Sequence, residues 1–249
     1  RGGVVVDFYR MRAIRNVDKS KQIVTVEPGI VWEKLDNELI KQGLTLRLYP
    51  SSYPSATVGG WLAQGGAGIG SFEAGWFRDN VLSARAVMPD GSVREFSGEE
   101  LDLVSSAEGI TGLISEVTLR VQPLEELEVV AVGCPDAYDL QKMAQDIIER
   151  ELPIWSLVFI NPRMAELKNK APLLEHFEHA VEERVLLPAS YIMTLAFRKK
   201  DGQAVRDGLA QVMKPCQAEL LSERIAEHEW KNRFKIMIVK RLGPSLVPA

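Results

Sequence analysis

The segment from Pro50 to Ser71 has the residue types best suited to binding chemistry in this sequence. Its glycines alternate with serine, threonine and aromatic residues, and it contains no lysine, arginine or histidine. Glycine lets main-chain amides approach a ligand without a Cβ atom in the way. A surface of amides and hydroxyls suits a phosphate group or a flat ring. We interpret the segment as a cofactor-binding loop; the alternative is a tightly packed crossover that holds no ligand.

Two common nucleotide-binding loops are excluded by the spacing of these glycines. The G-x-G-x-x-G spacing of nicotinamide-binding Rossmann loops would need glycine at Ser71 or at Glu73. The loop of nucleoside triphosphatases needs Gly-Lys-Ser or Gly-Lys-Thr, and neither tripeptide follows the glycines. The loop therefore belongs to another class of cofactor site.

Short β-rich runs separated by turns surround the loop in the first half of the chain. β-Branched or alternating residues predict strands at 4–6, 23–26, 81–88, 93–96 and 113–121. A Pro89-Asp90-Gly91 turn joins the third and fourth of these as a hairpin. A helix that ends at Gly43 is predicted by an apolar stripe of Val31, Leu35, Leu39 and Ile40.

The second half has fewer glycines and alternates strands with amphipathic helices, so we place a domain boundary near residue 124. Strands are predicted at 127–132, 154–160, 189–197 and 217–221. Helices are predicted from the apolar spacing of Leu140, Met143, Ala144, Ile147 and Ile148 and of Val205, Leu209 and Val212. A charged helical insert spans 164–183, and a last helix spans 222–240. This order of elements is typical of a ferredoxin-like α/β sandwich.

The composition excludes several classes of protein. The chain has 249 residues, of which 46% are hydrophobic, and no apolar run of about 18 residues predicts a membrane span. A net charge of -4 argues against a nucleic-acid-binding protein. Cys134 and Cys216 lie far apart, so we expect neither a disulfide framework nor an iron–sulfur cluster. We expect a cytoplasmic protein that would reach a membrane only through a partner. Both termini are expected to be cuts in a longer protein.

The loop belongs to a series of short motifs that covers nearly all of residues 1–124. In order they are Val4-Val5-Val6-Asp7, Val26-Glu27-Pro28-Gly29-Ile30, Pro50-Ser51-Ser52, Thr57-Val58-Gly59-Gly60, Gly75-Trp76-Phe77-Arg78-Asp79-Asn80-Val81, Met88-Pro89-Asp90-Gly91 and Glu108-Gly109-Ile110-Thr111-Gly112-Leu113-Ile114-Ser115-Glu116-Val117-Thr118-Leu119. With them the chain resembles the vanillyl-alcohol oxidase-like family of FAD-linked oxidases and dehydrogenases, whose flavin domain is called PCMH-type. Within that family it is most similar to the D-lactate, glycolate and D-2-hydroxyglutarate dehydrogenase branch.

The resemblance implies an α+β fold made of two domains. Residues 1–124 would be the second subdomain of a PCMH-type FAD-binding domain, with the first subdomain missing from this chain. Residues 125–249 would be a ferredoxin-like cap domain for the substrate, itself incomplete. Ala74 stands where this branch usually has an aromatic residue before Gly75, so we expect FAD to be bound without a covalent link.

The resemblance also assigns residues to the cofactor. Pro28 and Gly29 would lie near the FAD, the serine, threonine and glycine residues of the loop would line the diphosphate and the ring edge, and the stretch from Glu108 would hold the ribose and adenine. The alternative for Ile114 is an ordinary core position. The assigned FAD-binding residues are Pro28, Gly29, Pro50, Ser51, Ser52, Thr57, Gly59, Gly60, Gly66, Gly75, Glu108, Gly109, Gly112 and Ile114.

The substrate contacts implied by the resemblance lie near the end of the chain. Trp230 and Arg233 look like the Trp-x-x-Arg segment that presents an arginine to the substrate carboxylate, and Lys240 is a second candidate. A guanidinium can bind a carboxylate through two parallel hydrogen bonds. The alternative is a surface arginine on an amphipathic helix. No catalytic base is assigned and no metal is expected, because the paired His176 and His179 lie in a charged, solvated segment.

These expectations leave several functions open. The first is FAD-dependent oxidation of a small 2-hydroxy acid, of the D-lactate or glycolate type, to the 2-oxo acid. The electrons would pass to a quinone or to a protein acceptor, either an electron-transfer flavoprotein or an iron–sulfur subunit. The second is a non-catalytic fragment or scaffold subunit of a flavoprotein complex, unable to hold FAD by itself. A carbohydrate or alcohol oxidase is a third, but it would predict a covalent flavin.

Overall fold

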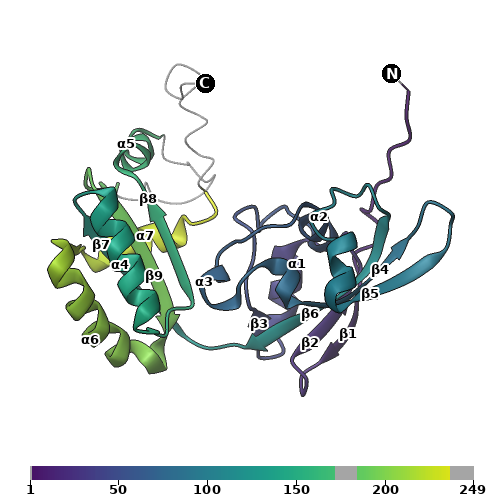
Figure 1. The fold of residues 1–249 in the computed structure, drawn as a ribbon, viewed down its shortest axis with the longest axis horizontal. Helices are drawn as coiled ribbons and strands as arrows, with labels where there is room; N and C mark the ends of the chain where they lie inside the picture. Colours follow the sequence, from purple (N-terminus) through teal and green to yellow (C-terminus); the bar gives the residue numbers. More distant parts are fainter. Residues whose placement is uncertain (1, 172–183, 236–249) are drawn as a thin grey trace. The chain divides into compact units, whose positions relative to one another are not determined.

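The computed structural model describes residues 2–171 and 184–235. Two compact units make up the chain, Arg1–Leu124 and Glu125–Ala249 (Figure 1). Both combine helices with antiparallel strands, so the predicted α+β class is confirmed.

The first unit is built on an antiparallel sheet whose strand order is β1-β2-β6-β4-β5, with β3 pairing separately with β6. β6 is the longest strand and pairs with three others, so it forms the centre of the unit. The strands are β1 (Ile14–Asp18), β2 (Ile23–Val26), β3 (Leu44–Leu46), β4 (Val81–Val87), β5 (Val93–Ser97) and β6 (Leu113–Pro123).

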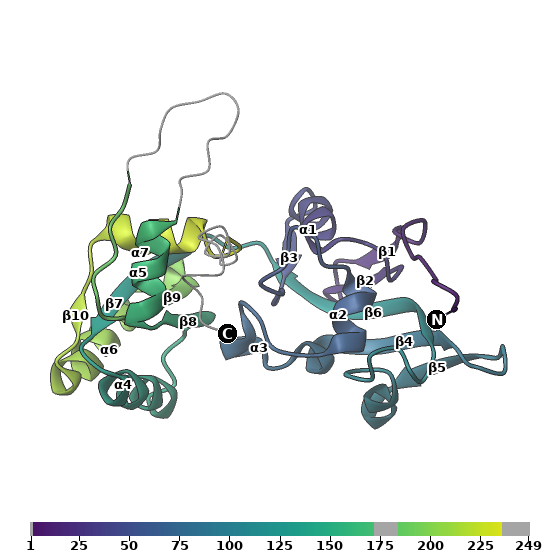
Figure 2. The same ribbon diagram turned by 90° about the horizontal axis from the view of Figure 1, so that it is seen from above.

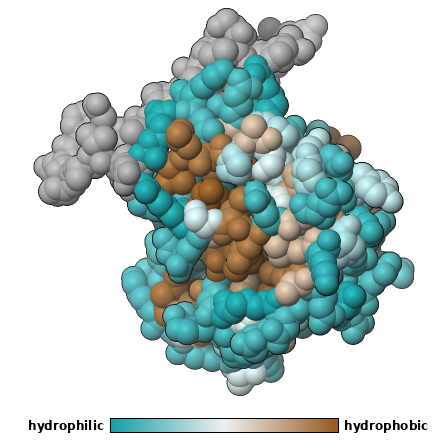
Figure 3. Space-filling model, turned by 90° about the vertical axis from the view of Figure 1, so that its left-hand side faces the viewer, coloured by the Kyte–Doolittle hydropathy of each residue, from teal (hydrophilic) through white to brown (hydrophobic). Residues whose placement is uncertain are grey.

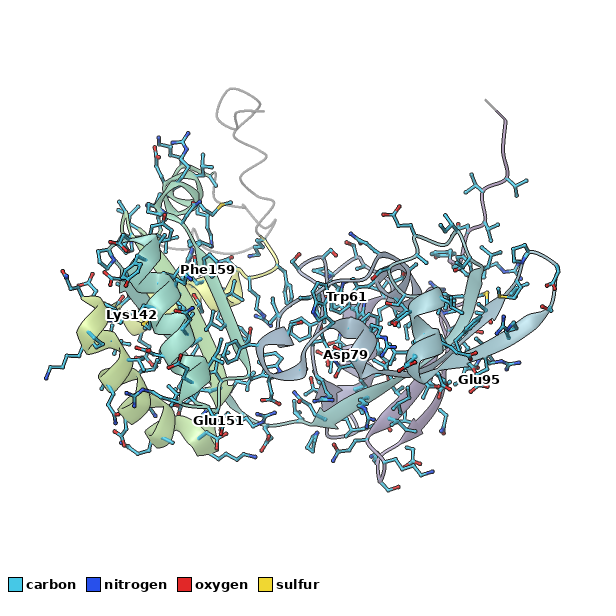
Figure 4. All side chains as sticks on the ribbon, in the orientation of Figure 1. Trp61, Asp79, Glu95, Lys142, Glu151 and Phe159 are labelled. Carbon is cyan, nitrogen blue, oxygen red and sulfur yellow. The ribbon has the colours of Figure 1, made fainter. Side chains whose placement is uncertain are left out.

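Short helices carry the segments between these strands. They are α1 (Trp32–Ile40), α2 (Val58–Gln64), α3 (Ser71–Ala74) and the 3-10 helices η1 (Phe77–Asn80) and η2 (Gly98–Leu103). Trp32 makes edge contacts with Trp61 and Phe77, with ring centroids 5.3 and 5.1 Å away. The rings of Trp61 and Phe77 stack at 4.6 Å. Trp61 is labelled in Figure 4. This aromatic cluster ties α1, α2 and η1 together.

Most predicted strands of the first unit are confirmed, including the hairpin of β4 and β5. The predicted strand at 4–6 is wrong. Val4 and Val5 are 91% and 94% exposed, and no strand pairs with them in the described part of the chain. β-Branched residues favour a strand only where a neighbouring strand and a packed surface exist. Ile40 was also placed wrongly in the apolar stripe, since it is 41% exposed whereas Leu35 and Leu39 are buried.

The second unit has a four-stranded antiparallel sheet in the order β10-β7-β9-β8. In chain order these are the fourth, first, third and second strands, and helices follow the first and third. The predicted ferredoxin-like arrangement is therefore confirmed. The elements are β7 (Leu127–Cys134), α4 (Ala137–Glu149), β8 (Ser156–Ile160), α5 (Pro162–Lys170), β9 (Tyr191–Arg198), η3 (Lys199–Asp201), α6 (Gly202–Met213), η4 (Lys214–Cys216), β10 (Glu219–Leu220) and α7 (Glu223–Lys231).

Helices cover both faces of this sheet, α4 and α6 on one face and α5 and α7 on the other (Figure 2). The predicted apolar faces of α4 and α6 are buried, except that Ile148 is 59% exposed. The opposite face has its own small core, which contains Ala131, Ala165, Leu187, Ile192 and Ala226. The unit is thus a three-layer structure with two separate apolar layers.

Two predicted helices are shorter than expected. The helix predicted to begin at Ser222 ends at Lys231 rather than continuing to 240. Asn232 follows its last turn, and the Asn232 side chain donates to the His228 carbonyl (2.9 Å). Of the insert predicted at 164–183, α5 ends at Lys170. The rest of the insert from 172, and the end of the last helix from 236, lie outside the described residues.

The β10 edge of the second sheet is only partly covered. β10 pairs with Val132 and Gly133 alone, so the first four residues of β7 stay half-buried. Figure 3 looks onto this edge and shows apolar side chains gathered in its middle, bordered by hydrophilic ones. Of the described helices, none is long and apolar enough to cross a membrane.

Candidate functional site

The start of α2 lies directly against the Pro28–Gly29 loop. The Gly59 amide donates to the Pro28 carbonyl at 2.8 Å, and a Cβ atom on Gly59 would lie 2.9 Å from the Pro28 Cα. Only glycine allows this approach. Thr57 precedes the helix, and its Oγ1 accepts the Gly60 amide at 3.2 Å as an N-cap. The structure thus brings Pro28, Thr57 and Gly59 together, with the Gly59 amide already bonded within the protein.

The other side of this loop is held by the segment before β1. The Gly29 amide donates to the Met11 carbonyl at 2.7 Å. The Glu27 carboxylate, only 8% exposed, accepts the Ala13 amide at 2.7 Å and the Arg15 guanidinium. The Pro28–Gly29 loop is therefore fixed between two segments of the first unit.

Pro50, Ser51 and Ser52 begin a tight turn. Pro50 is buried, and both serines are exposed. The turn is closed by main-chain bonds from Tyr53 to Pro50 (3.0 Å) and from Ala56 to Ser52 (2.8 Å). Among the described residues, no group receives a hydrogen bond from the hydroxyl or the amide of either serine. Four donors in a row are free for a ligand.

The glycines after α2 adopt left-handed backbone angles, with φ of 78° at Gly65 and 125° at Gly66. The space beside Gly65 is filled by the Ser106 side chain. The space beside Gly66 is open, since a Cβ atom there would meet only the Trp61 Nε1, at 3.6 Å. The Gly66 carbonyl accepts the Phe77 amide at 3.1 Å, whereas the Gly66 amide donates to no described group, so the amide is the part that a ligand could use.

The stretch that begins at Ser105 lies along the end of α2. The Ser106 amide donates to the Leu62 carbonyl (3.1 Å), and the Glu108 amide to the Ala63 carbonyl (2.8 Å). Glu108 and Gly109 are exposed and left-handed, with φ of 49° and 79°. The structure thus brings Glu108 and Gly109 to the glycine segment.

Gly112 and Ile114 lie further along the same stretch. A Cβ atom on Gly112 would lie 3.0 Å from the Val87 carbonyl, at the end of β4. Ile114 is on β6, and only 6% of its surface is exposed. Its side chain belongs to the core, which leaves its main-chain groups as the part that a ligand could use.

Two buried polar groups near the glycine segment were not among the predicted site residues. Asn80 is 1% exposed and donates to the Ala74 and Trp76 carbonyls (2.8 and 2.9 Å), which flank Gly75. Its Oδ1, and the Oγ of the buried Ser105, have no hydrogen-bond partner among the described residues. Such orphaned atoms are rare in folded proteins unless a ligand or water supplies a partner. Asn80 lies within the motif from Gly75 to Val81, whereas nothing in the sequence marks Ser105.

This arrangement fits FAD. A diphosphate carries negative charge, and the segment from Pro50 to Trp76 has no basic residue, so amide and hydroxyl donors would have to meet it. The free serine donors and the Gly66 amide, which donates to no described group, supply such donors. The orphaned Ser105 hydroxyl could also donate, whereas the Asn80 Oδ1 can only accept and would need an N–H or O–H group of the ligand.

In the second unit, Arg233 is held just after α7. Its Nη1 donates to the Trp230 carbonyl at 2.7 Å, and its guanidinium lies 4.2 Å from the Trp230 ring and 4.4 Å from the Phe234 ring. Its Nε is buried without a partner among the described residues. Trp230 in turn makes an edge contact with the buried Trp155, at 5.9 Å. Lys240 lies outside the described residues.

A buried ion pair fixes α7 to α5. Lys168 Nζ lies 2.5 Å from Glu229 Oε2, and the two side chains are 11% and 6% exposed. Because Glu229 directly precedes Trp230, the pair holds the end of α7 that leads to Arg233.

Neither cysteine nor a metal site adds chemistry in the described residues. Cys134 and Cys216 are free and buried, and burial raises the pKa of Cys134 to about 11. No three His, Cys, Asp or Glu side chains of residues 2–171 and 184–235 are grouped to hold a metal ion. His176 and His179 fall outside those ranges.

Comparison with known proteins places the first unit in a protein family. Residues 1–97 match a family model described as an FAD binding domain. The mitochondrial D-lactate dehydrogenase [cytochrome] of Arabidopsis thaliana is 36% identical over 141 residues, which cover 53% of this chain and 24% of that protein. A D-lactate dehydrogenase of Anaerostipes hadrus is 28% identical, over 91% of this chain and 58% of that protein.

A solved structure shows the same fold across both units. An alkyldihydroxyacetonephosphate synthase matches with a TM-score of 0.76 and 20% identity, over 94% of this chain and 45% of that protein. The chain spans about a quarter to just over half of the length of the proteins it matches. These similarities agree with the geometry of the glycine segment. Residues 1–97 belong to an FAD-binding domain, and the chain as a whole is similar to FAD-linked dehydrogenases.

Proposed function

We propose that the chain is part of an enzyme that oxidises a small 2-hydroxy acid, of the D-lactate or glycolate type, to the 2-oxo acid. The observation that carries the proposal is the match to the D-lactate dehydrogenase of Anaerostipes hadrus, because it covers 91% of this chain. A match of that extent includes the second unit and so goes beyond a shared FAD-binding domain. In this proposal the first unit binds FAD and the second unit covers the substrate.

The residues proposed to hold FAD come from the stretches that meet around α2. Ser51 and Ser52 bind the diphosphate through their free hydroxyls and amides, and Gly66 presents its amide to it. Glu108 and Gly109 hold the ribose and adenine end. When bound, FAD supplies a two-electron acceptor for the substrate hydride. Ala74 offers no side chain for a covalent link, so the cofactor is held by non-covalent contacts.

Arg233 is proposed to bind the substrate carboxylate. The Trp230 and Phe234 rings and the Trp230 carbonyl hold its guanidinium in one orientation. A planar guanidinium that is already oriented loses less conformational entropy when it forms a two-bond pair with a carboxylate. Lys240 stays a second candidate for the same contact.

The electrons of the reduced cofactor must leave to an acceptor outside this chain. Its two cysteines cannot ligate an iron–sulfur cluster on their own. The name of the Arabidopsis thaliana relative gives cytochrome as the acceptor of that protein. For this chain we propose a quinone, an electron-transfer flavoprotein or an iron–sulfur subunit. We propose a cytoplasmic location, with contact to a membrane only through such a partner.

A second candidate function is a non-catalytic subunit or fragment that does not hold FAD by itself. Flavin content separates the two candidates, since the first requires bound FAD and the second excludes it.

The proposal is tested by anaerobic reduction of the flavin-loaded protein, followed by the loss of visible flavin absorbance. D-lactate, glycolate and D-2-hydroxyglutarate are the test substrates, with L-lactate and a primary alcohol for comparison. At least one 2-hydroxy acid should bleach the flavin. Arg233→Lys should raise the half-saturating concentration about tenfold or more, since one charged hydrogen bond contributes roughly 1.5–3 kcal/mol. Arg224→Lys on α7 is the matched control. A flavin that no 2-hydroxy acid reduces would contradict the proposal.

A further inference from the structure

Asp36 on α1 is a buried carboxylate with three hydrogen bonds to neutral groups. Only 7% of the residue is exposed. Oδ1 accepts the Thr45 hydroxyl at 2.9 Å and the Leu46 amide at 3.2 Å, and Oδ2 accepts the Tyr53 hydroxyl at 3.0 Å. A buried charge is costly unless several donors satisfy it. Asp36 therefore joins three segments: α1, β3 and the turn that follows Pro50.

Tyr53 is fixed at both ends. Its carbonyl accepts the Glu33 amide at 3.3 Å, its amide donates to the Pro50 carbonyl at 3.0 Å, and its ring centroid lies 5.0 Å from that of Tyr49. Burial, followed by the negative charge of Asp36, raises the pKa of the Tyr53 hydroxyl above its ordinary value. The hydroxyl thus stays protonated and remains a donor to Asp36.

The serines next to Tyr53 have no such anchor. Ser51 and Ser52 are exposed, and in the described part of the chain their hydroxyls and amides donate to no protein group. Their orientation depends on the turn itself. The turn is tied to α1 by the main chain of Tyr53 and by the bond between the Tyr53 hydroxyl and Asp36.

We propose that Asp36 and Tyr53 are positioning residues for the FAD diphosphate. Neither touches the cofactor. Asp36 holds the Tyr53 hydroxyl, and Tyr53 holds the turn in the conformation that points the Ser51 and Ser52 donors at the diphosphate. The inference rests on the proposed function, because it assumes that these serines bind FAD. A pre-oriented pair of donors binds more tightly than a mobile pair, since less conformational entropy is lost on binding.

The test compares FAD with riboflavin, which has the same ring but no diphosphate. Tyr53→Phe keeps the aromatic ring and removes only the hydroxyl. The dissociation constants of both flavins are measured by fluorescence titration of the full chain. For FAD the constant should rise about five- to tenfold, the effect of losing one hydrogen bond. For riboflavin it should stay within about twofold. A general loss of folding would weaken both flavins alike.

Three further measurements test the same assignment. Thr45→Val removes another bond to the same carboxylate but lies on β3, outside the turn, so FAD affinity should stay within about twofold. Hydrogen exchange of the peptide 50–56 should be faster in Tyr53→Phe and unchanged in Thr45→Val. Asp36→Asn should raise the dissociation constant of FAD, as Tyr53→Phe does.

The outcomes separate this inference from the proposed function. If the unmodified chain binds FAD and Tyr53→Phe binds it equally well, or weakens FAD and riboflavin by the same factor, the positioning role is overturned and the proposed function stands. If the unmodified chain binds no FAD, the proposed function is overturned, and the positioning role with it.

Discussion

A methyl group added at Gly59 is expected to destabilise the first unit. The Cβ of Gly59→Ala would lie 2.9 Å from the Pro28 Cα and 3.1 Å from the Pro28 carbonyl oxygen. Carbon atoms in good contact lie about 3.5–4.0 Å apart, so α2 would have to move away from Pro28. That movement also lengthens the hydrogen bond from the Gly59 amide to the Pro28 carbonyl.

The expected change in the free energy of unfolding is the sum of three contributions. Overpacking costs typically about 1–3 kcal/mol. Weakening the bond to Pro28 costs about 1 kcal/mol. Alanine recovers about 1 kcal/mol through its higher helix propensity. We therefore expect Gly59→Ala to lower the free energy of unfolding by about 2 kcal/mol. In Gly60→Ala, the matched control, the new Cβ meets only the Thr57 hydroxyl at 2.8 Å. If that hydroxyl rotates away, the loss of its N-cap bond, about 1 kcal/mol, is offset by about 1 kcal/mol from the higher helix propensity of alanine.

Urea unfolding followed by tryptophan fluorescence measures the difference. The chain has two units, so the curve is fitted with two transitions, and the second-unit transition serves as an internal control. Gly60→Ala should stay within about 0.5 kcal/mol of the unmodified chain. A Gly59→Ala variant as stable as Gly60→Ala would refute the close packing of α2 on Pro28.

Two other predictions concern the second unit. Glu229→Gln keeps the size of the side chain but leaves Lys168 buried and unpaired. The free energy of unfolding of the second transition in urea should therefore fall by about 3 kcal/mol. A change below about 0.5 kcal/mol would show that the pair is dispensable. Because the pKa of Cys134 is raised to about 11 by burial, its stabilising effect is complete below the pKa of about 8.5 that an unfolded thiol has, and it is lost as the pH rises towards 11. The urea midpoint should therefore fall between pH 8 and pH 10.5, and a thiol reagent should label Cys134 far more slowly in the native protein than in urea. Equal labelling rates would contradict the buried position.

Elements with strong local signals were predictable from the sequence. The β4–β5 hairpin has a Pro-Asp-Gly turn between β-branched runs, and the faces of α4 and α6 follow helical spacing, so neighbouring residues alone determine them. Val4 and Ile40 were mispredicted because burial depends on which surface the rest of the fold provides. Propensity and periodicity do not contain that information.

The residues of the candidate site were also only partly predictable from the sequence. The glycine and serine residues of the site are visible in the composition of the loop, and the motif from Gly75 to Val81 indicates the segment that contains Asn80. The anchors of the site are less visible. Asp36 looks like one more polar residue on a helix, and only the fold brings it to Tyr53 and Thr45. Contacts of this kind join positions that have no periodic relation, so a single sequence cannot reveal them.

The central claim, that this chain binds FAD through its first unit, is tested most directly by titrating FAD into the purified chain. Visible absorbance and flavin fluorescence are followed, after a check for flavin that is already bound. The account predicts saturable binding of one FAD per chain, weakened when Ser51 and Ser52 are both replaced by alanine and unchanged when the exposed Ser20 and Ser92 are replaced. The claim would be contradicted if FAD showed no saturable binding, or if replacing Ser51 and Ser52 left the affinity for FAD unchanged.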